Sequence, residues 1–364
     1  MLPLTDHFDG LKTNLNPPDD RQALAEDLPT KVRDHLAASA ILATVADPPV
    51  SRLAGSYGRR TVSGDIKDVD TLVFVDRSYR TDVEGVFADL AAALKDLEVD
   101  GYGKGEIKTN RKQRRSAHVE FKKDGIDAFH VDVVPVIRPG DDPTAVLEIP
   151  DREWTTWVPT QPLGYGKRLS EVNADWGGEV VPMIRYFKRI KFHNMPTGRP
   201  KSYWSEVMVY RLFADGVLPR TKPLGATFNQ AERMLQVLRG VLANYGQNAL
   251  YGMQPPQVAD PCLGNNIAHA WPNEDYLRWV KMLRNVVETI EAVEDSTDRD
   301  ESIAAWQKVF GADVFKPSEE AVAAEAARAK AIATGAKIAG GSIVPAGTAT
   351  GGLVVPAHRA YGDR

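Results

Sequence analysis

Three aspartates lie next to runs of apolar residues that are typical of β-strands. Asp68 and Asp70 precede the run 71–75, and Asp132 lies inside the run 129–136. Residues two apart on a strand point to the same side, so the Asp68 and Asp70 carboxylates repel each other unless a cation offsets their charge. Hard oxygen ligands suit Mg²⁺ better than zinc or copper, and a carboxylate in an apolar run needs a partner. The three aspartates are therefore predicted to bind Mg²⁺ together.

A Gly-Ser pair stands shortly before these carboxylates. Gly55 and Ser56 are followed by the turn-forming pair Tyr57-Gly58. Backbone N–H groups and a small hydroxyl in such a turn can bind phosphate oxygens. Three carboxylates beside this turn favour two-metal nucleotidyl transfer, in which one ion activates an attacking hydroxyl and the other holds the triphosphate and the leaving pyrophosphate. The alternative is a solvated strand edge and an ordinary turn.

The composition of the chain bounds its class. With 364 residues, 43% hydrophobic and 26% charged, it is long enough for one large or two fused globular domains. The single cysteine, Cys262, rules out an intrachain disulfide and a cysteine-rich zinc module, as expected in a reducing cytoplasm. The N-terminal residues do not resemble a secretory signal, and no run reaches the roughly 20 apolar residues of a membrane span. A net charge of −4 gives no electrostatic case for obligate DNA binding, so we expect a cytoplasmic protein without a membrane or obligate DNA partner.

Apolar periodicity predicts the elements that position the carboxylates. A strand is expected at 50–54, a helix after Asp82, and a hairpin of strands 117–121 and 126–136 that carries the third aspartate. The basic stretch 104–115 before the hairpin is interpreted as a solvated loop. The alternative is a surface that steers triphosphates or RNA into the cleft, although no aromatic residues alternate with its charges.

The second half of the chain has a different character. Residues 138–166 are rich in Pro, Gly, Asp and Trp and are expected to form an irregular crossover. Beyond it, apolar faces at helical spacing predict helices at 180–193, 203–213, 228–245, 274–292 and 301–310. The predicted fold class is α+β, with an α/β lobe over 1–150, a helical lobe over 151–317 and the active site in the cleft between them. The Ala- and Gly-rich tail, 318–364, is expected to be flexible.

Motifs in both halves resemble a known family. A Gly-Ser pair, an Asp-x-Asp and a distant Asp on a strand resemble the DNA polymerase β-like nucleotidyltransferases. More narrowly, about residues 20 to 316 resemble the bacterial cyclic-oligonucleotide synthases (CD-NTases) of CBASS anti-phage defence, relatives of cyclic GMP-AMP synthase and oligoadenylate synthase. The matching motifs are Gly55-Ser56-Tyr57, Asp68-Val-Asp70, His130-Val-Asp-Val-Val-Pro135, Trp157 with Thr160-Gln-Pro162, Ile184-Arg-Tyr-Phe-Lys188, Lys201-Ser-Tyr203 with Glu206, Asp260-Pro with Asn265-Asn266, and Trp306 to Gly311 with Phe315. Each motif is weak alone, but their common order is specific.

This resemblance implies a polymerase β-like catalytic lobe with a mixed sheet, joined to a C-terminal helical lobe. It implies synthesis of a cyclic di- or trinucleotide second messenger from NTPs, ATP among them, with two Mg²⁺ or Mn²⁺ ions and release of pyrophosphate. Asp68, Asp70 and Asp132 resemble the metal carboxylates of the family, and Gly55 and Ser56 resemble its triphosphate-binding turn.

Three further site residues are implied by the resemblance alone. Lys188 resembles the phosphate-binding lysine of the family, Ser202 its second hydroxyl contact, and Tyr203 the residue that stacks on a nucleobase. A solvated helix face is the alternative for Lys188. The chain departs from the common pattern at Arg60, where many relatives have glycine.

Several alternatives stay open at this stage. A linear-oligonucleotide or RNA-tailing enzyme would share the same carboxylates, a silent nucleotide-binding scaffold would not need them, and a toxin could transfer a nucleotide to RNA or protein. In some relatives the C-terminus is a handle for a ubiquitin-like conjugation partner. We therefore expect such a protein, or a regulatory protein of the effector system, to bind 318–364; a tail without a role is the alternative. Base composition, linkage and ring size of the product, the activation signal and the oligomeric state are not predicted.

Overall fold

The computed structural model describes most of the chain. The described residues are 1–45, 51–66, 68–104, 106–108, 113–123, 126–138, 145–333, 337–339 and 342–344. They form two compact units, residues 1–316 and residues 317–364.

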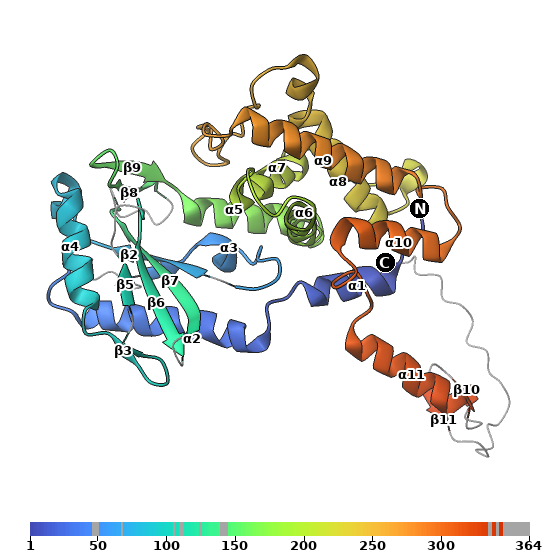
Figure 1. The fold of residues 1–364 in the computed structure, drawn as a ribbon, viewed down its shortest axis with the longest axis horizontal. Coiled ribbons are helices and arrows are strands. Elements are labelled where there is room, and N and C mark those ends of the chain that lie inside the picture. Colours follow the sequence, from blue (N-terminus) through green and yellow to red (C-terminus); the bar gives the residue numbers. More distant parts are fainter. Residues whose placement is uncertain are drawn as a thin grey trace. The chain divides into compact units, whose positions relative to one another are not determined.

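A five-stranded mixed sheet lies in the first unit, with strand order β1-β2-β7-β6-β5 (Figure 1). The parallel pair β2 and β7 is flanked by antiparallel neighbours. The strands are β1 (Ser51–Leu53), β2 (Asp68–Phe74), β5 (Glu106–Lys108), β6 (Ala117–Lys123) and β7 (Ile126–Val136). The predicted mixed sheet and the hairpin that carries Asp132 are thus confirmed. The basic stretch 104–115 was expected to be a loop throughout, but part of it pairs with β6 as β5, and 109–112 lie outside the described residues.

Two long helices cover one face of this sheet, namely α2 (Asp19–Ala38) and α4 (Val83–Leu94) (Figure 1). Valines at alternate strand positions point toward them and share a buried core: Val69, Val73, Val119, Val131 and Val133. Asp82, as expected, begins α4, and its side chain accepts a hydrogen bond from Gly85 N. Because strand side chains alternate, the residues between the valines point to the opposite face. That face carries the predicted carboxylates.

The segment after the sheet is more regular than the prediction of an irregular crossover. It contains the hairpin of β8 (Leu147–Asp151) and β9 (Thr156–Thr160), followed by helix α5 (Pro162–Asp175). Pro162 is the first residue of α5, where a missing N–H does not disrupt the helix. The hairpin packs on the carboxylate-bearing face of the sheet through Leu72, Phe74 and Leu147.

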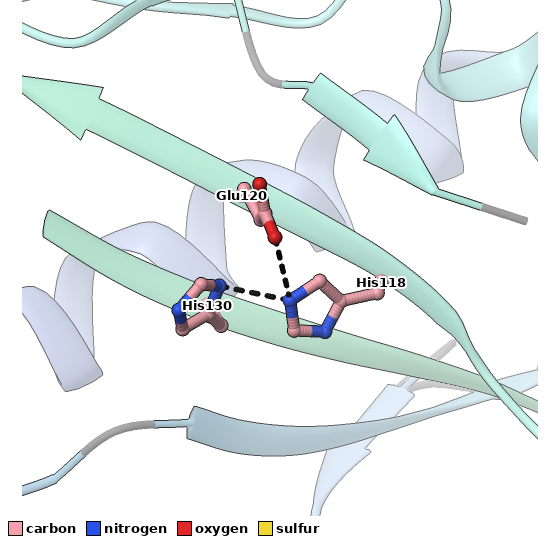
Figure 2. Close-up of side chains that lie close together, drawn as sticks. All are labelled: His118, Glu120 and His130. Carbon is pink, nitrogen blue, oxygen red and sulfur yellow. Dashed lines mark hydrogen bonds and ion pairs between the residues drawn. The ribbon is translucent and has the colours of Figure 1, made fainter. Parts of the chain in front are cut away.

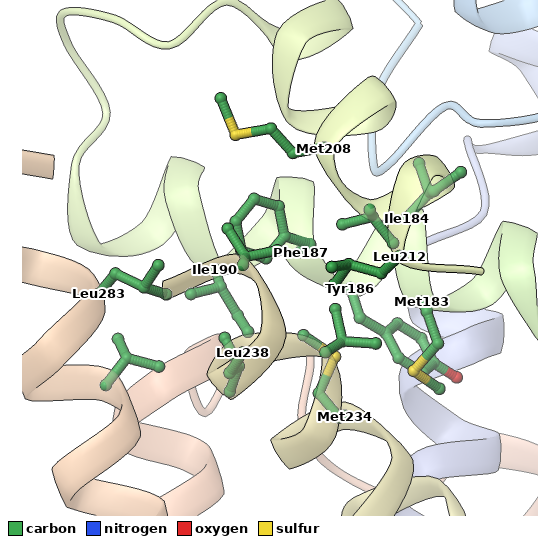
Figure 3. Packing of buried hydrophobic residues seen from close by; sticks show 14 of the residues in the cluster. Met183, Ile184, Tyr186, Phe187, Ile190, Met208, Leu212, Met234, Leu238 and Leu283 are labelled. Atoms are coloured by element: carbon green, nitrogen blue, oxygen red, sulfur yellow. The ribbon is translucent and has the colours of Figure 1, made fainter. Parts of the chain in front are cut away.

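Helices dominate the rest of the first unit. They are α6 (Val180–Asn194), α7 (Ser202–Ala214), α8 (Gln230–Tyr245), α9 (Asn273–Glu291) and α10 (Arg299–Phe310), which confirms the five predicted helices. Helix α6 packs against α5, α7, α8 and α10. Figure 3 shows Phe187 and Ile190 of α6 beside Leu238 of α8 and Leu283 of α9. The α+β prediction, with a mixed sheet and a C-terminal helical part, is confirmed.

The N-terminus belongs to the helical core. Helix α1 (Thr5–Asn14) buries Phe8, whose ring centroid lies 5.3 Å from that of Trp306 and 5.1 Å from that of Phe315. Short elements complete this unit: α3 (Gly55–Gly58), η1 (Arg77–Thr81), β3 (Glu98–Val99), β4 (Gly103–Lys104), η2 (Pro223–Gly225) and η3 (Gln247–Tyr251). The predicted domain limits near 150 and 317 stay predictions.

The second unit contains helix α11 (Glu319–Ala333) and a small hairpin of β10 (Lys337–Ala339) and β11 (Ser342–Val344). The rest of the tail, to which partner binding was assigned, lies outside the described residues. Within the part of the chain that is described, no helix has both the length and the apolar character needed to cross a membrane.

Candidate active site

The register of the parallel pair β2 and β7 brings the three aspartates onto one patch of the sheet. Asp70 pairs with Asp132, and Asp68 pairs with His130. Neighbouring strands lie about 4.8 Å apart, so the carboxylates of Asp70 and Asp132 stand side by side. The structure therefore places the three predicted carboxylates together on the face opposite α2 and α4.

The Gly-Ser turn lies directly against this patch. Residues 55–58 form the single helical turn α3, and Ala54 N, just before it, donates to Asp70 O at 2.8 Å. Gly55 has a φ of 64°, and a Cβ atom there would overlap Asp70 Oδ2. Only glycine fits so close to the carboxylate, which explains why the turn begins with this residue.

The pKa of Asp70 is perturbed by its surroundings. Its pKa is raised to about 6, first because it is desolvated and then because Asp132 and Asp68 place negative charge beside it. Arg59 acts in the opposite direction without cancelling these effects. An all-oxygen set with this excess of negative charge fits hard divalent cations such as Mg²⁺ or Mn²⁺.

A cavity of about 330 Å³ adjoins Asp68, whereas Asp70 and Asp132 are not part of its lining. Four of the predicted site residues line it: Ser56, Asp68, Lys188 and Ser202. They come from α3, β2, α6 and α7, so the cavity lies where the sheet meets the helices. Ser205 Oγ in its wall is buried and has no hydrogen-bond partner within the described part of the chain. The cavity thus offers hydroxyl and ammonium groups next to a carboxylate, as a metal-bound triphosphate would require.

Lys188 is a buried, fully bonded residue in this structure rather than a solvated one. Its Nζ donates to Glu206 Oε2 at 2.6 Å, to Thr61 O at 3.0 Å and to Thr61 Oγ1 at 3.1 Å. A lysine ammonium has three donors, and these contacts use all of them. Lys188 therefore holds the loop after α3 against the helices while its charge lies at the wall of the cavity.

Glu206 of α7 is the centre of this junction. Glu206 is fully buried. Arg59 Nε donates to its Oε1 at 2.6 Å, and Thr61 Oγ1 donates to its Oε2 at 2.7 Å. Burial by itself would raise the pKa of Glu206, but the charges of Lys188 and Arg59 and their hydrogen bonds hold it at about 2. The glutamate is thus ionised at neutral pH, and it connects the loop after α3 to α6 and α7.

Tyr203 and Arg60 lie outside the lining of this cavity. Tyr203 is half-buried, its hydroxyl donates to Asp260 Oδ2 at 3.0 Å, and its ring lies 5.4 Å from the Arg59 guanidinium. Arg60 has a φ of 59°, the conformation that glycine adopts readily, and lines a second cavity of about 770 Å³ beside α5 and α6. The 330 Å³ cavity and this second cavity thus lie on either side of the turn 55–58 and the residues that follow it.

Sequence reasoning missed several groups at the site. Lys191 and Phe192 of α6 line the same cavity as Lys188, and helical spacing of three and four residues could have identified them as its face neighbours. His118 of β6 pairs with Asp132, and its Nδ1 lies 2.6 Å from Asp132 Oδ1. Nothing local to His118 in the sequence indicates this contact.

Comparisons with known proteins show which families this chain is similar to. Residues 2–173 match the family described as Second Messenger Oligonucleotide or Dinucleotide Synthetase domain. The chain is 26% identical over 270 residues to a curated cyclic AMP-AMP-AMP synthase of Acinetobacter sp. (strain ATCC 27244 / 9458), an alignment that covers 71% of each chain.

Solved structures share the fold. The CD-NTase CdnG of Bradyrhizobium diazoefficiens in complex with GTP superposes with a TM-score of 0.64 at 16% identity, covering 86% of this chain and 97% of that chain. This chain therefore has the fold of the CD-NTases. CdnC of Escherichia coli MS115-1, in its complex with HORMA-deltaN, gives a TM-score of 0.61 at 18% identity, covering 86% of this chain and 98% of that chain. The similarity to CD-NTases that the sequence predicts is confirmed.

The buried junction predicts a large effect of one isosteric change. Glu206→Gln leaves Arg59 and Lys188 without their shared counter-ion, so it should lower the free energy of unfolding by about 3–5 kcal/mol. Urea denaturation at pH 7 measures this. Glu291→Gln is the matched control, because Glu291 pairs with Arg239 at the exposed surface and its loss should change the free energy by at most about 1 kcal/mol. Equal effects of the two changes would contradict the assignment.

The raised pKa of Asp70 predicts a pH-dependent gain in stability on its neutralisation. Between its ordinary value of 3.8 and about 6, the folded protein binds the Asp70 proton and the unfolded chain does not, so stability falls as pH rises through this window. In chelator at pH 8, Asp70→Asn should raise the free energy of unfolding by up to about 3 kcal/mol, and below pH 4 the gain should disappear. Exposed Asp34, changed to Asn, should alter it by less than about 0.5 kcal/mol. A gain for Asp70→Asn that is the same at both pH values would refute the charge explanation.

Proposed function

We propose that this protein is a nucleotidyltransferase that joins NTPs into a cyclic oligonucleotide second messenger, with release of pyrophosphate, in anti-phage signalling. The observation that carries the proposal is the pairing of Asp70 with Asp132 on β2 and β7, with Asp68 beside the Ser56 turn in one cavity. The similarity to cyclic-oligonucleotide synthases favours cyclisation over linear RNA tailing. The paired carboxylates also speak against a silent scaffold.

The cofactors we propose are two Mg²⁺ ions, with Mn²⁺ as a substitute, held by Asp68, Asp70 and Asp132. When bound, these ions would neutralise the triphosphate and make the attacking hydroxyl more acidic. Desolvation and the negative charges of Asp132 and Asp68 raise the pKa of Asp70, and this supports the choice, because a bound cation would offset the repulsion.

The NTP would be positioned by groups of the cavity wall. The backbone at Gly55 and the hydroxyls of Ser56 and Ser202 would bind phosphate oxygens, and the Lys188 and Lys191 ammonium groups would supply positive charge behind them. We retain Tyr203 as the proposed base-stacking residue, since its half-buried ring stands on the first turn of α7 next to Ser202.

The attacking hydroxyl would lose its proton at Asp132. His118 already contacts Asp132 Oδ1, which leaves Oδ2 as the oxygen to receive the proton of a ribose 2′- or 3′-hydroxyl. The same transfer would repeat until a free ribose hydroxyl of the linear oligonucleotide attacks the α-phosphate at its own 5′ end, which would close the ring.

We propose ATP as a substrate, in line with the name of the Acinetobacter relative, a cyclic AMP-AMP-AMP synthase. A regulatory protein partner is proposed from the Escherichia coli CdnC complex with HORMA-deltaN. We retain the C-terminal tail as the proposed contact for such a protein or for a ubiquitin-like conjugation partner, and the cytoplasm as the compartment.

Product analysis tests this function. Purified protein is incubated with the four NTPs and Mg²⁺ or Mn²⁺, treated with phosphatase and examined by mass spectrometry. We expect phosphatase-resistant products of cyclic mass that contain adenylate, and their loss in Asp68→Asn and Asp70→Asn. Asp34→Asn, on the far helix α2, should retain them.

Two results would contradict the proposal. Products that phosphatase degrades would indicate linear oligomers and support the tailing alternative. Cyclic products that persist in both aspartate variants would show that the paired carboxylates are not the catalytic site.

A further inference from the structure

Strands β6 and β7 carry a cluster of two histidines and a glutamate, which lies beside the proposed catalytic carboxylates. Figure 2 shows His118, Glu120 and His130 turned toward a common point. One ligand atom of each, two ring nitrogens and a carboxylate oxygen, all lie within 4.8 Å of one another. No step of the proposed function uses Glu120 or His130.

Strand geometry places these side chains together. His118 and Glu120 are two apart on β6, so both point to the carboxylate-bearing face, and Glu120 pairs with His130 across the hairpin. The two imidazole rings stack with their centroids 4.5 Å apart. His118 Nε2 lies 2.8 Å from His130 Nδ1 and 3.5 Å from Glu120 Oε1.

The contact with Asp132 fixes the state of His118. A carboxylate only accepts hydrogen bonds, so the Asp132 oxygen 2.6 Å from His118 Nδ1 requires a proton on that nitrogen. In the neutral ring, Nε2 then carries a lone pair, and it points at His130 and Glu120. In metal sites of proteins, a carboxylate often accepts a hydrogen bond from the ring nitrogen that does not bind the metal, and this contact orients the imidazole.

Glu120 lies nearly buried beside the imidazoles. It is 7% exposed, its Oε2 lies 3.8 Å from Lys122 Nζ, and its Oε1 lies 3.5 Å from His118 Nε2. Ligand atoms of a tetrahedral site with bonds near 2.1 Å stand about 3.4 Å apart. Two separations here are 2.8 and 3.5 Å and the third is at most 4.8 Å, so side-chain shifts of about 1 Å would bring the three atoms to this spacing.

We propose that His118, Glu120 and His130 form a binding site for a divalent transition-metal ion such as Zn²⁺. Two imidazoles and one carboxylate suit such an ion, whereas the all-carboxylate set at Asp68, Asp70 and Asp132 suits Mg²⁺. The ion takes the place of the proton that His130 Nδ1 donates to His118 Nε2, and that same proton moves to His130 Nε2, so both rings stay neutral. Three protein ligands leave a fourth position for water. The bound ion holds His118, and through it Asp132, in one orientation.

Metal binding without nucleotide tests this site independently of the proposed activity. Zn²⁺ is titrated into chelator-treated protein by calorimetry, and Co²⁺ is titrated with detection of its visible absorption, which is intense in tetrahedral sites. The wild type should bind one ion per chain with a tetrahedral Co²⁺ spectrum. Glu120→Gln and His130→Gln should each weaken binding at least about tenfold, the smaller end of the loss caused by removing even a supporting residue.

Two controls keep the test specific. His269→Gln, at an exposed histidine that contacts Asn266 O, should bind Zn²⁺ as the wild type does. Asp68→Asn with Asp70→Asn should keep the Co²⁺ spectrum, because those carboxylates are not ligands of this site. Thermal unfolding confirms that each variant is folded.

The proposal is overturned if the wild type binds no Zn²⁺ at micromolar concentrations, in which case the cluster is only a hydrogen-bonded histidine pair. It is also overturned if binding survives Glu120→Gln and His130→Gln but is lost with Asp68→Asn and Asp70→Asn. The ion would then occupy the catalytic carboxylates.

Discussion

Electrostatic repulsion among three aspartates on one face of a sheet is the constraint around which the first unit is built. The parallel register of β2 and β7 sets Asp70 beside Asp132. Desolvation, and then repulsion by Asp132 and Asp68, raise the pKa of Asp70 to about 6. The other face of the same strands is covered by α2 and α4, whose apolar contacts stabilise the strands. The hydrophobic core thus holds the carboxylates in an arrangement that they would not adopt alone, and a bound cation removes the strain.

A second electrostatic element joins the sheet to the helices. Glu206 accepts hydrogen bonds from Arg59, Thr61 and Lys188, so one buried anion organises the loop after α3 and the wall of the 330 Å³ cavity. Breaking such a buried pair leaves an uncompensated charge, so separating the loop from the helices costs free energy. This matters for the proposed function because the turn 55–58 and the carboxylates would have to keep a fixed spacing during each transfer.

Much of this could be predicted from the sequence, and the exceptions have physical reasons. The five helices and the hairpin follow from apolar periodicity, and the Asp-x-Asp pattern places two carboxylates on one face. Helix α5 was missed because Pro162 and two nearby glycines resemble a loop. The contact of His118 with Asp132 depends on a register shift between Phe121 and Lys122; counting from the turn without this bulge would pair His118 with Val131. The bonds of Lys188 to Glu206 and Thr61 join segments distant in sequence, so no local pattern reveals them.

The central claim, that Asp68, Asp70 and Asp132 jointly bind the divalent cations of nucleotide transfer, is tested most directly by crystallography with Mn²⁺ and a non-hydrolysable ATP analogue. The anomalous scattering of Mn²⁺ locates the ion directly in the crystal. The account predicts anomalous peaks in contact with Asp68, Asp70 and Asp132 and with the phosphates of the analogue near Ser56. An analogue bound elsewhere, or bound with no Mn²⁺ peak at these carboxylates, would contradict it.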